Sequence, residues 1–161
     1  MIKTKKIVLA GLFTALAFIF TYFVRIPISA TGYFNIGDAF IILSAIIIDP
    51  ISGLLVGILA GTMSDLVAGY VAFIPFTIVA KGLEAIVAGL IYQKLRGPLR
   101  YSGIILGPLL MVIVYAFSYW ILFDFNLMLA SIPLDLLQAA IAVILSFALI
   151  KVFEKTPFLN K

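Results

Sequence analysis

Cysteine and histidine are both absent from the 161 residues of this sequence. Without them the chain has no disulfide, no thiol nucleophile, no zinc–thiolate site and no catalytic triad that depends on histidine. Charge is also scarce, since 11% of the residues are charged whereas 65% are hydrophobic. This balance is typical of a chain that lies mainly in lipid. The sequence has no Gly-x-x-x-x-Gly-Lys-[Ser/Thr] loop, so we expect it to hydrolyse no nucleotide itself.

Long charge-poor runs predict an all-α integral membrane protein with a single transmembrane domain over residues 1–161. We favour a retained first helix over a cleaved signal peptide, because the run before Arg25 is long and lacks a small-residue cleavage site. The second run is short, and the sequence leaves open whether that helix is tilted or starts below the membrane surface. Asp49-Pro50 is expected to end this second helix and to separate it from the third helix. The six predicted helices cover 7–24, 35–48, 51–69, 76–93, about 102–123 and about 131–153.

The formal net charge of +4 does not indicate nucleic acid, because the cations lie in short flanks between the apolar runs. On one side of the predicted spans Arg25 is the loop cation. The cations of the other side are Lys3, Lys5, Lys6, Lys94, Arg96, Arg100, Lys151, Lys155 and Lys161. By the positive-inside rule both termini are cytoplasmic, and we expect a multi-pass protein of the bacterial plasma membrane.

Five ionisable residues lie in or at the edge of the apolar helices, in the half of the bundle predicted to face outward. They are Asp38, Asp65, Lys81, Glu84 and Asp135. Such residues are costly in lipid and indicate a functional site or internal pairing. Asp38 stands three residues after Asn35, which favours a role in starting a helix. For Asp135 a first-turn acid and a ligand contact are equally supported, whereas we favour function for Asp65, Lys81 and Glu84.

Aromatic residues gather at the same predicted end, and a membrane-interface belt would account for most of them. They are Tyr33, Phe34, Tyr70, Phe73, Phe76, Tyr115, Tyr119 and Trp120. Together with buried polar groups they suit a pocket for a small, flat, polar heterocycle. The predicted substrate-binding residues are Tyr33, Asp65, Tyr70, Lys81, Glu84, Tyr119, Trp120, Asn126, Asp135 and Gln138. We predict no catalytic residue, metal site or cofactor.

Small residues mark two helix faces. Gly53, Gly57 and Gly61 are four residues apart on the third helix and predict close packing within the bundle. On the first helix the small residues crowd the cytoplasmic half, where they offer either internal packing or a surface for a partner helix. This second patch consists of Ala10, Gly11, Thr14 and Ala15.

The stretch GYFNIGDAFIILSAIIIDPISGLLVGILAGTMSDLVAGY, followed by KGLEAIVAGLI, resembles the substrate-binding S components of energy-coupling factor (ECF) vitamin transporters. The resemblance is best from Gly32 to Ile91. It implies a six-helix protein that captures a vitamin from outside and joins a membrane T component and two cytoplasmic ATPases, whose ATP-driven changes topple it in the membrane. Family members dock through Ala-x-x-x-Ala on the first helix, where this chain has Gly11-x-x-x-Ala15. Within the family the sequence is most similar to hydroxymethylpyrimidine or pyridoxine-type members.

The residues are also compatible with two other classes of function. A self-sufficient, oligomeric secondary transporter or channel would use Asp65, Lys81 and Glu84 to relay protons. An intramembrane aspartyl protease would need two carboxylates close together, for example Asp65 with Glu84 or Asp135. No recognisable catalytic motif surrounds those acids, so we do not favour an enzyme.

Overall fold

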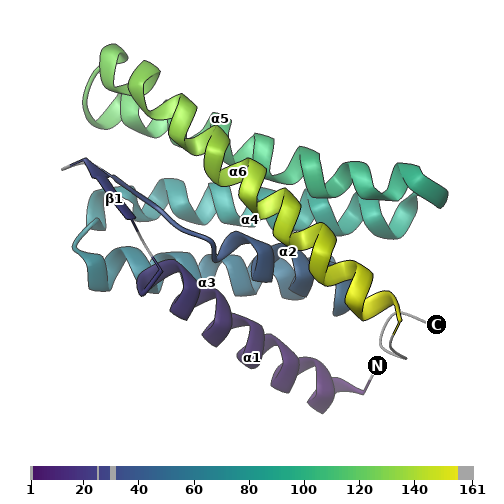
Figure 1. Cartoon of the computed structure of the whole chain (residues 1–161). Helices are drawn as coiled ribbons and strands as arrows, with labels where there is room; N and C mark the ends of the chain where they lie inside the picture. The colour runs from purple at the N-terminus through teal and green to yellow at the C-terminus, as the bar shows by residue number, and fades with distance from the viewer. Residues whose placement is uncertain (1, 25, 30–31, 156–161) are drawn as a thin grey trace.

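The computed structural model describes residues 2–24, 26–29 and 32–155, and of 26–29 and 32–34 it describes the backbone alone. The fold is a bundle of long helices in which the start of the first helix and the end of the last helix lie at one end and the β1 strand at the other (Figure 1). The helices are α1 (Lys3–Tyr22), α2 (Asp38–Ile47), α3 (Pro50–Ala68), α4 (Ile74–Lys94), α5 (Ser102–Leu122) and α6 (Phe125–Glu154). Short 3₁₀ helices precede α4 and α5, namely η1 (Val71–Phe73) and η2 (Gly97–Tyr101).

The predicted helices are all present, but α2 is much shorter than the others. Its ten residues would span about 15 Å, half of a hydrocarbon core. By length and composition, the described residues contain five helices able to cross a membrane, and α2 is not among them. It packs instead against α1, α3, α4 and α6, and most of its residues are buried. The second helix is therefore a core element enclosed by the long helices.

A small antiparallel hairpin departs from the all-α prediction. Strand β1 (Ile26–Ser29) pairs with β2 (Gly32–Phe34), with Ile26 opposite Phe34 and Pro27 opposite Tyr33. The strands contain β-branched and aromatic residues, which favour extended structure. The hairpin lies at the end of the bundle away from the termini (Figure 1).

The turn between α2 and α3 forms at Asp49-Pro50, as predicted. The Asp49 Oδ1 atom accepts a hydrogen bond of 2.8 Å from the Ser52 N–H and caps α3, while Pro50 occupies the first turn. The Lys6 ammonium lies 2.8 Å from Asp49 Oδ2 and ties the start of α1 to this turn. Burial raises the pKa of the Asp49 carboxyl, but the Lys6 and Ser52 hydrogen bonds outweigh it and hold that pKa below its ordinary value.

Helix α6 begins earlier than the predicted start near Ser131. Asp124 caps it by accepting a 2.9 Å hydrogen bond from the Leu127 N–H, and Pro133 then lies inside the helix. Proline favours the first turn of a helix, which made a start near Ser131 plausible from the sequence. Because the helix starts at Phe125, Asp135 lies well beyond its first turn, and the interpretation of Asp135 as a first-turn acid is wrong.

The glycine stripe on α3 provides close packing within the bundle, as predicted. A Cβ on Gly53 would overlap the Ala45 side chain of α2. A Cβ on Gly57 would lie 2.9 Å from the Lys81 carbonyl oxygen, and one on Gly61 would lie 2.7 Å from Thr77 Cγ2. Helices α2 and α4 therefore approach α3 closely, and α4 carries its polar residues up against this stripe.

We expect Gly57→Ala to lower the melting temperature of the purified protein, because its Cβ meets backbone that cannot rotate away. Overpacking of this kind costs about 1–3 kcal/mol, more than the roughly 0.5–1 kcal/mol that alanine contributes in a helix. Gly11→Ala is the matched control, since nothing lies within 4 Å of a Cβ at Gly11. Equal melting temperatures for the two variants would show that α3 and α4 are not packed as described.

Candidate functional site

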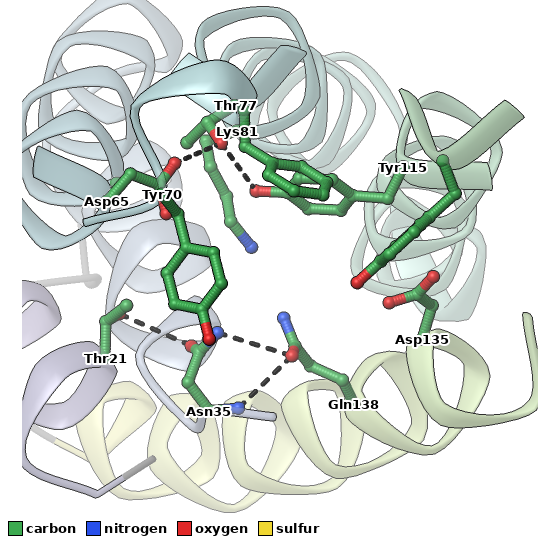
Figure 2. Close-up of a pocket in the computed structure, with 12 residues that line it drawn as sticks. Thr21, Asn35, Asp65, Tyr70, Thr77, Lys81, Tyr115, Asp135 and Gln138 are labelled. Atoms are coloured by element: carbon green, nitrogen blue, oxygen red, sulfur yellow. Dashed lines mark hydrogen bonds between the residues drawn. The ribbon is translucent and has the colours of Figure 1, made fainter. Parts of the chain in front are cut away.

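A cavity opens at the end of the bundle that carries the β hairpin. It encloses about 500 Å³ of non-atom space, counting the open solvent at its mouth. Every long helix contributes to it, together with the loop before α2 and the turn after α3 (Figure 2). Its lining residues are Thr21, Asn35, Gly61, Asp65, Tyr70, Phe73, Thr77, Lys81, Tyr115, Tyr119, Asp135 and Gln138.

A buried cluster of charges forms the floor of this cavity. The Lys81 ammonium lies 2.5 Å from Asp38 Oδ1 and 3.5 Å from Glu84 Oε2. Lys81 is 2% exposed, and both acids are fully buried. Charges buried to this degree need pairing, and removing one partner is strongly destabilising. Asp38 is the first residue of α2, as the interpretation of a helix-starting acid predicts, but the start of α2 has no side-chain cap and the carboxylate is instead the near partner of Lys81.

Gln138 links this floor to the wall formed by α1 and the loop before α2. Its Nε2 donates a 2.7 Å hydrogen bond to Asp38 Oδ2, and its Oε1 accepts bonds of 3.2 and 3.3 Å from the backbone N–H and side-chain amide of Asn35. The Asn35 Oδ1 in turn accepts from the Gly37 N–H and from the Thr21 hydroxyl, at 3.0 and 3.3 Å. One continuous hydrogen-bonded path therefore joins α6, α2 and the end of α1. Figure 2 shows the part of it that runs from Gln138 through Asn35 to Thr21.

A second polar path runs up the opposite wall. The Thr77 hydroxyl donates a 2.5 Å hydrogen bond to Asp65 Oδ2, and the Tyr115 hydroxyl donates one of 3.2 Å to Thr77 Oγ1. The Lys81 ammonium also lies 5.5 Å from the centroid of the Tyr115 ring, within the range of a cation–π contact. These contacts orient the Asp65 carboxylate and the Tyr115 ring at the cavity surface.

Asp135 and the aromatic residues complete the wall. Figure 2 shows the Asp135 carboxylate directed into the same open space as Lys81 and Gln138. Its Oδ2 atom is buried and has no hydrogen-bond partner among the described residues. The rings of Phe73 and Tyr119 meet edge to face with centroids 5.2 Å apart, and Tyr70 packs against Phe73 at 6.3 Å. A flat ligand would find both aromatic surfaces and an unpaired acceptor here.

Six of the predicted substrate-binding residues line the cavity: Asp65, Tyr70, Lys81, Tyr119, Asp135 and Gln138. Glu84 lies beneath the floor beside Lys81. Two others lie away from the cavity. Trp120 is 51% exposed and packs against Phe117 and Phe125, because one residue along α5 from Tyr119 turns the side chain outward. Asn126 is exposed in the first turn of α6. The Tyr33 side chain lies outside the described part of the structure.

Several lining residues were missing from the predicted set. Three of them stand four residues before a predicted residue on the same helix: Gly61 before Asp65, Thr77 before Lys81, and Tyr115 before Tyr119. Residues at this spacing share a helix face, so the spacing carried a usable signal. Phe73 and Tyr115 already belonged to the predicted aromatic group. Thr21 comes from α1, where the sequence shows no feature that marks it.

The small-residue patch on α1 forms one wall of an apolar groove, which we call the α1–α3 groove. Ala10, Gly11, Thr14 and Ala15 line it with Ile7 and Phe18 from α1 and Leu55, Val56, Leu59 and Met63 from α3. The Thr14 hydroxyl donates to the Ala10 carbonyl at 2.8 Å, so it is already satisfied. A Cβ on Gly11 would meet nothing within 4 Å, and close internal packing therefore does not explain this glycine.

The chain is similar to known transporter proteins along nearly its whole length. A family model described as "ECF-type riboflavin transporter, S component" matches residues 1–155. A Pyrococcus woesei protein described as "Uncharacterized protein in gap 3'region" is 31% identical over 140 residues, which is 84% of this chain and 92% of the relative. The solved structure of the S component of a bacterial ECF transporter aligns with a TM-score of 0.81 at 19% identity, covering 99% of this chain and 100% of that one. The last match shows a common fold.

Proposed function

The chain belongs to the family of ECF-type riboflavin transporter S components, and from this premise we propose that its cavity captures a small vitamin or vitamin precursor outside the cell. Membership makes it a vitamin-binding transporter subunit with membrane-spanning helices, and the family is one of transporters rather than enzymes. The observation that carries the proposal is the cavity itself, which combines buried charges, amide groups and aromatic rings at one end of the bundle.

We propose that the cavity faces the outside and that both termini are cytoplasmic, in the plasma membrane. The helix directions support this orientation. Lys6 lies in the first turn of α1, Lys94 ends α4 and Arg100 pairs with Glu154 at the end of α6. These basic residues therefore lie at the end of the bundle where α1 starts and α6 ends, and the cavity lies at the opposite end. The positive-inside rule assigns the basic end to the cytoplasm.

The proposed substrate is a flat nitrogen heterocycle that carries hydroxyl or amino groups. Riboflavin is a candidate because the matching family model is described by that vitamin. Hydroxymethylpyrimidine and pyridoxine are candidates because the sequence resembles S components for such ligands. All of these would place a ring against Phe73, Tyr115 or Tyr119 and direct polar groups to Asp65, Asp135 or Gln138.

The α1–α3 groove is the proposed docking surface for the membrane T component, which would act with two cytoplasmic ATPases to topple the loaded subunit. The groove is apolar, and its α1 side is built from small residues that allow a partner helix to approach closely. Leu55, Leu59 and Met63 on α3 supply exposed apolar side chains for the same contact. Capture and docking would then use separate surfaces of one subunit.

The test is binding by the purified chain without partners. We expect a vitamin to co-purify and to be identified by mass spectrometry, and calorimetric titration of a vitamin panel to give saturable one-to-one binding. A variant that lacks one aromatic wall of the cavity, Tyr119→Ala, should bind the ligand more weakly, because Tyr119 lines the cavity. If no vitamin co-purifies and none in the panel binds, the capture function is wrong.

A proton-driven secondary transporter is the competing function, since the buried acids beside Lys81 resemble a proton relay. The two functions differ in their energy source. We expect reconstituted uptake to require the T component, the ATPases and ATP. Uptake by the chain alone, driven by a proton gradient, would favour the secondary transporter.

A further inference from the structure

Resting on the proposed function, we infer that the cavity selects ligands that bring a positive charge or an amino group to Asp135 and rejects phosphorylated or carboxylated forms. The inference concerns the charge of the substrate, which neither the fold nor the family determines. It follows from the balance of charges and hydrogen-bond donors at the cavity, taken over the side chains that the structure describes.

Acids outnumber bases at this site. Asp65 and Asp135 line the cavity, and Asp38 and Glu84 lie beneath it, whereas Lys81 is the basic residue among the described lining side chains. The Lys81 ammonium is already paired with Asp38 at 2.5 Å and lies 3.5 Å from Glu84. An anionic ligand would therefore meet the acidic side chains of Asp65 and Asp135 and a lysine that is already paired within the protein. Such repulsion is strong where water is excluded.

The donors around the cavity are also largely turned toward protein acceptors. Gln138 donates to Asp38, Thr77 donates to Asp65, and Tyr115 donates to Thr77. A phosphate or carboxylate needs several donors aimed at it, as at other anion sites. These three side chains already direct a donor at a neighbour, so they form no ready-made anion site.

Asp135 supplies the complementary feature, a carboxyl group with one oxygen that lacks a donor. Its Oδ2 atom is buried without a hydrogen-bond partner among the described residues, and leaving such an oxygen unpaired is unfavourable. A ligand N–H would satisfy it, and a protonated amidine-like edge would bind a carboxylate through two parallel hydrogen bonds. The aromatic rings of Phe73 and Tyr119 beside it also favour a cation over an anion.

The experiment compares each vitamin with its own phosphorylated form on the purified wild-type chain. The probes are riboflavin and riboflavin 5′-phosphate, hydroxymethylpyrimidine and its phosphate, thiamine and thiamine monophosphate, and pyridoxamine and its phosphate, with pantothenate as a carboxylate. We expect the tightest ligand to carry an amino group or a positive charge, and its phosphate to bind at least roughly 100-fold more weakly, about 2.7 kcal/mol.

A variant tests the role of Asp135 directly. Asp135→Asn keeps the shape and an acceptor oxygen of the side chain but removes its charge. It should weaken binding of the amino or cationic ligand at least roughly tenfold, and it should reduce the difference in affinity between that ligand and its phosphate. Asp124→Asn is the matched control on the same helix, because Asp124 is an exposed cap residue outside the cavity. The control should bind as the wild type does.

The outcomes separate the inference from the function on which it rests. Tight binding of a phosphorylated vitamin or of pantothenate would overturn the charge inference while capture stands, and so would a tightest ligand with neither an amino group nor a positive charge, such as riboflavin. An unchanged preference in folded Asp135→Asn would overturn the role of Asp135. If that variant does not fold, the wild-type comparison of each vitamin with its phosphate still decides the charge preference. Absence of binding by every probe would reject capture and the charge inference together.

Discussion

Replacing Lys81 with methionine is expected to destabilise the protein more than any other single substitution considered above. Methionine keeps most of the length of the side chain but leaves Asp38 and Glu84 fully buried with no cation beside them. Removing one partner of a buried pair costs roughly 3–5 kcal/mol. The melting temperature of the purified protein should fall markedly, and vitamin binding should be lost with the shape of the cavity floor.

A double variant shows whether the loss comes from unpaired charge. Lys81→Met with Asp38→Asn removes one charge of each sign, and asparagine still offers Gln138 an acceptor in place of Asp38 Oδ2. We expect the double variant to recover most of the melting temperature and part of the binding. A single variant as stable as the wild type would contradict the pairing, and a double variant less stable than the single would contradict the proposed cause.

A bulky residue in the α1–α3 groove should abolish transport while leaving capture intact. Ala15→Leu or Gly11→Leu places an isobutyl group where the small residues of α1 would admit a partner helix. We expect ATP-dependent uptake and co-purification with the T component to fall by at least roughly tenfold, which corresponds to about 1.4 kcal/mol. Vitamin binding by the isolated chain should stay within roughly twofold of the wild type, about 0.4 kcal/mol.

Ala140→Leu is the matched control, because Ala140 is an exposed alanine of α6 that lines neither the cavity nor the groove. It should assemble and transport normally. If Ala15→Leu and a cavity variant such as Tyr119→Ala produced the same pair of defects, capture and docking would not use separate surfaces. Normal uptake by both groove variants would show that the T component docks on another face of the protein.

The sequence by itself determined the order of the long helices and the kind of chemistry available. Charge-poor runs and the Asp49-Pro50 break are local features, and each long run became a helix, although α6 starts at Phe125 and is longer than predicted. Asp65, Lys81, Asp135 and Gln138 were identified because a polar side chain stands out against an apolar helix, whatever its neighbours are. The close packing at the glycine stripe on α3 was also predictable from the sequence, since the four-residue spacing lies within one helix.

Tertiary structure decided which of these side chains meet. The pairing of Asp38 with Lys81 joins residues 43 apart in sequence, and the bond from Gln138 to Asp38 joins residues 100 apart. No pattern within a helix contains the rotation of α2 against α4 and α6 that sets those contacts. The packing of α1 likewise brought Thr21 to the cavity, whereas helix periodicity alone already separates Trp120 from the face of α5 that carries Tyr119. Hydrophobicity along a chain sets where helices form, whereas the packing of their faces sets which polar groups share a cavity.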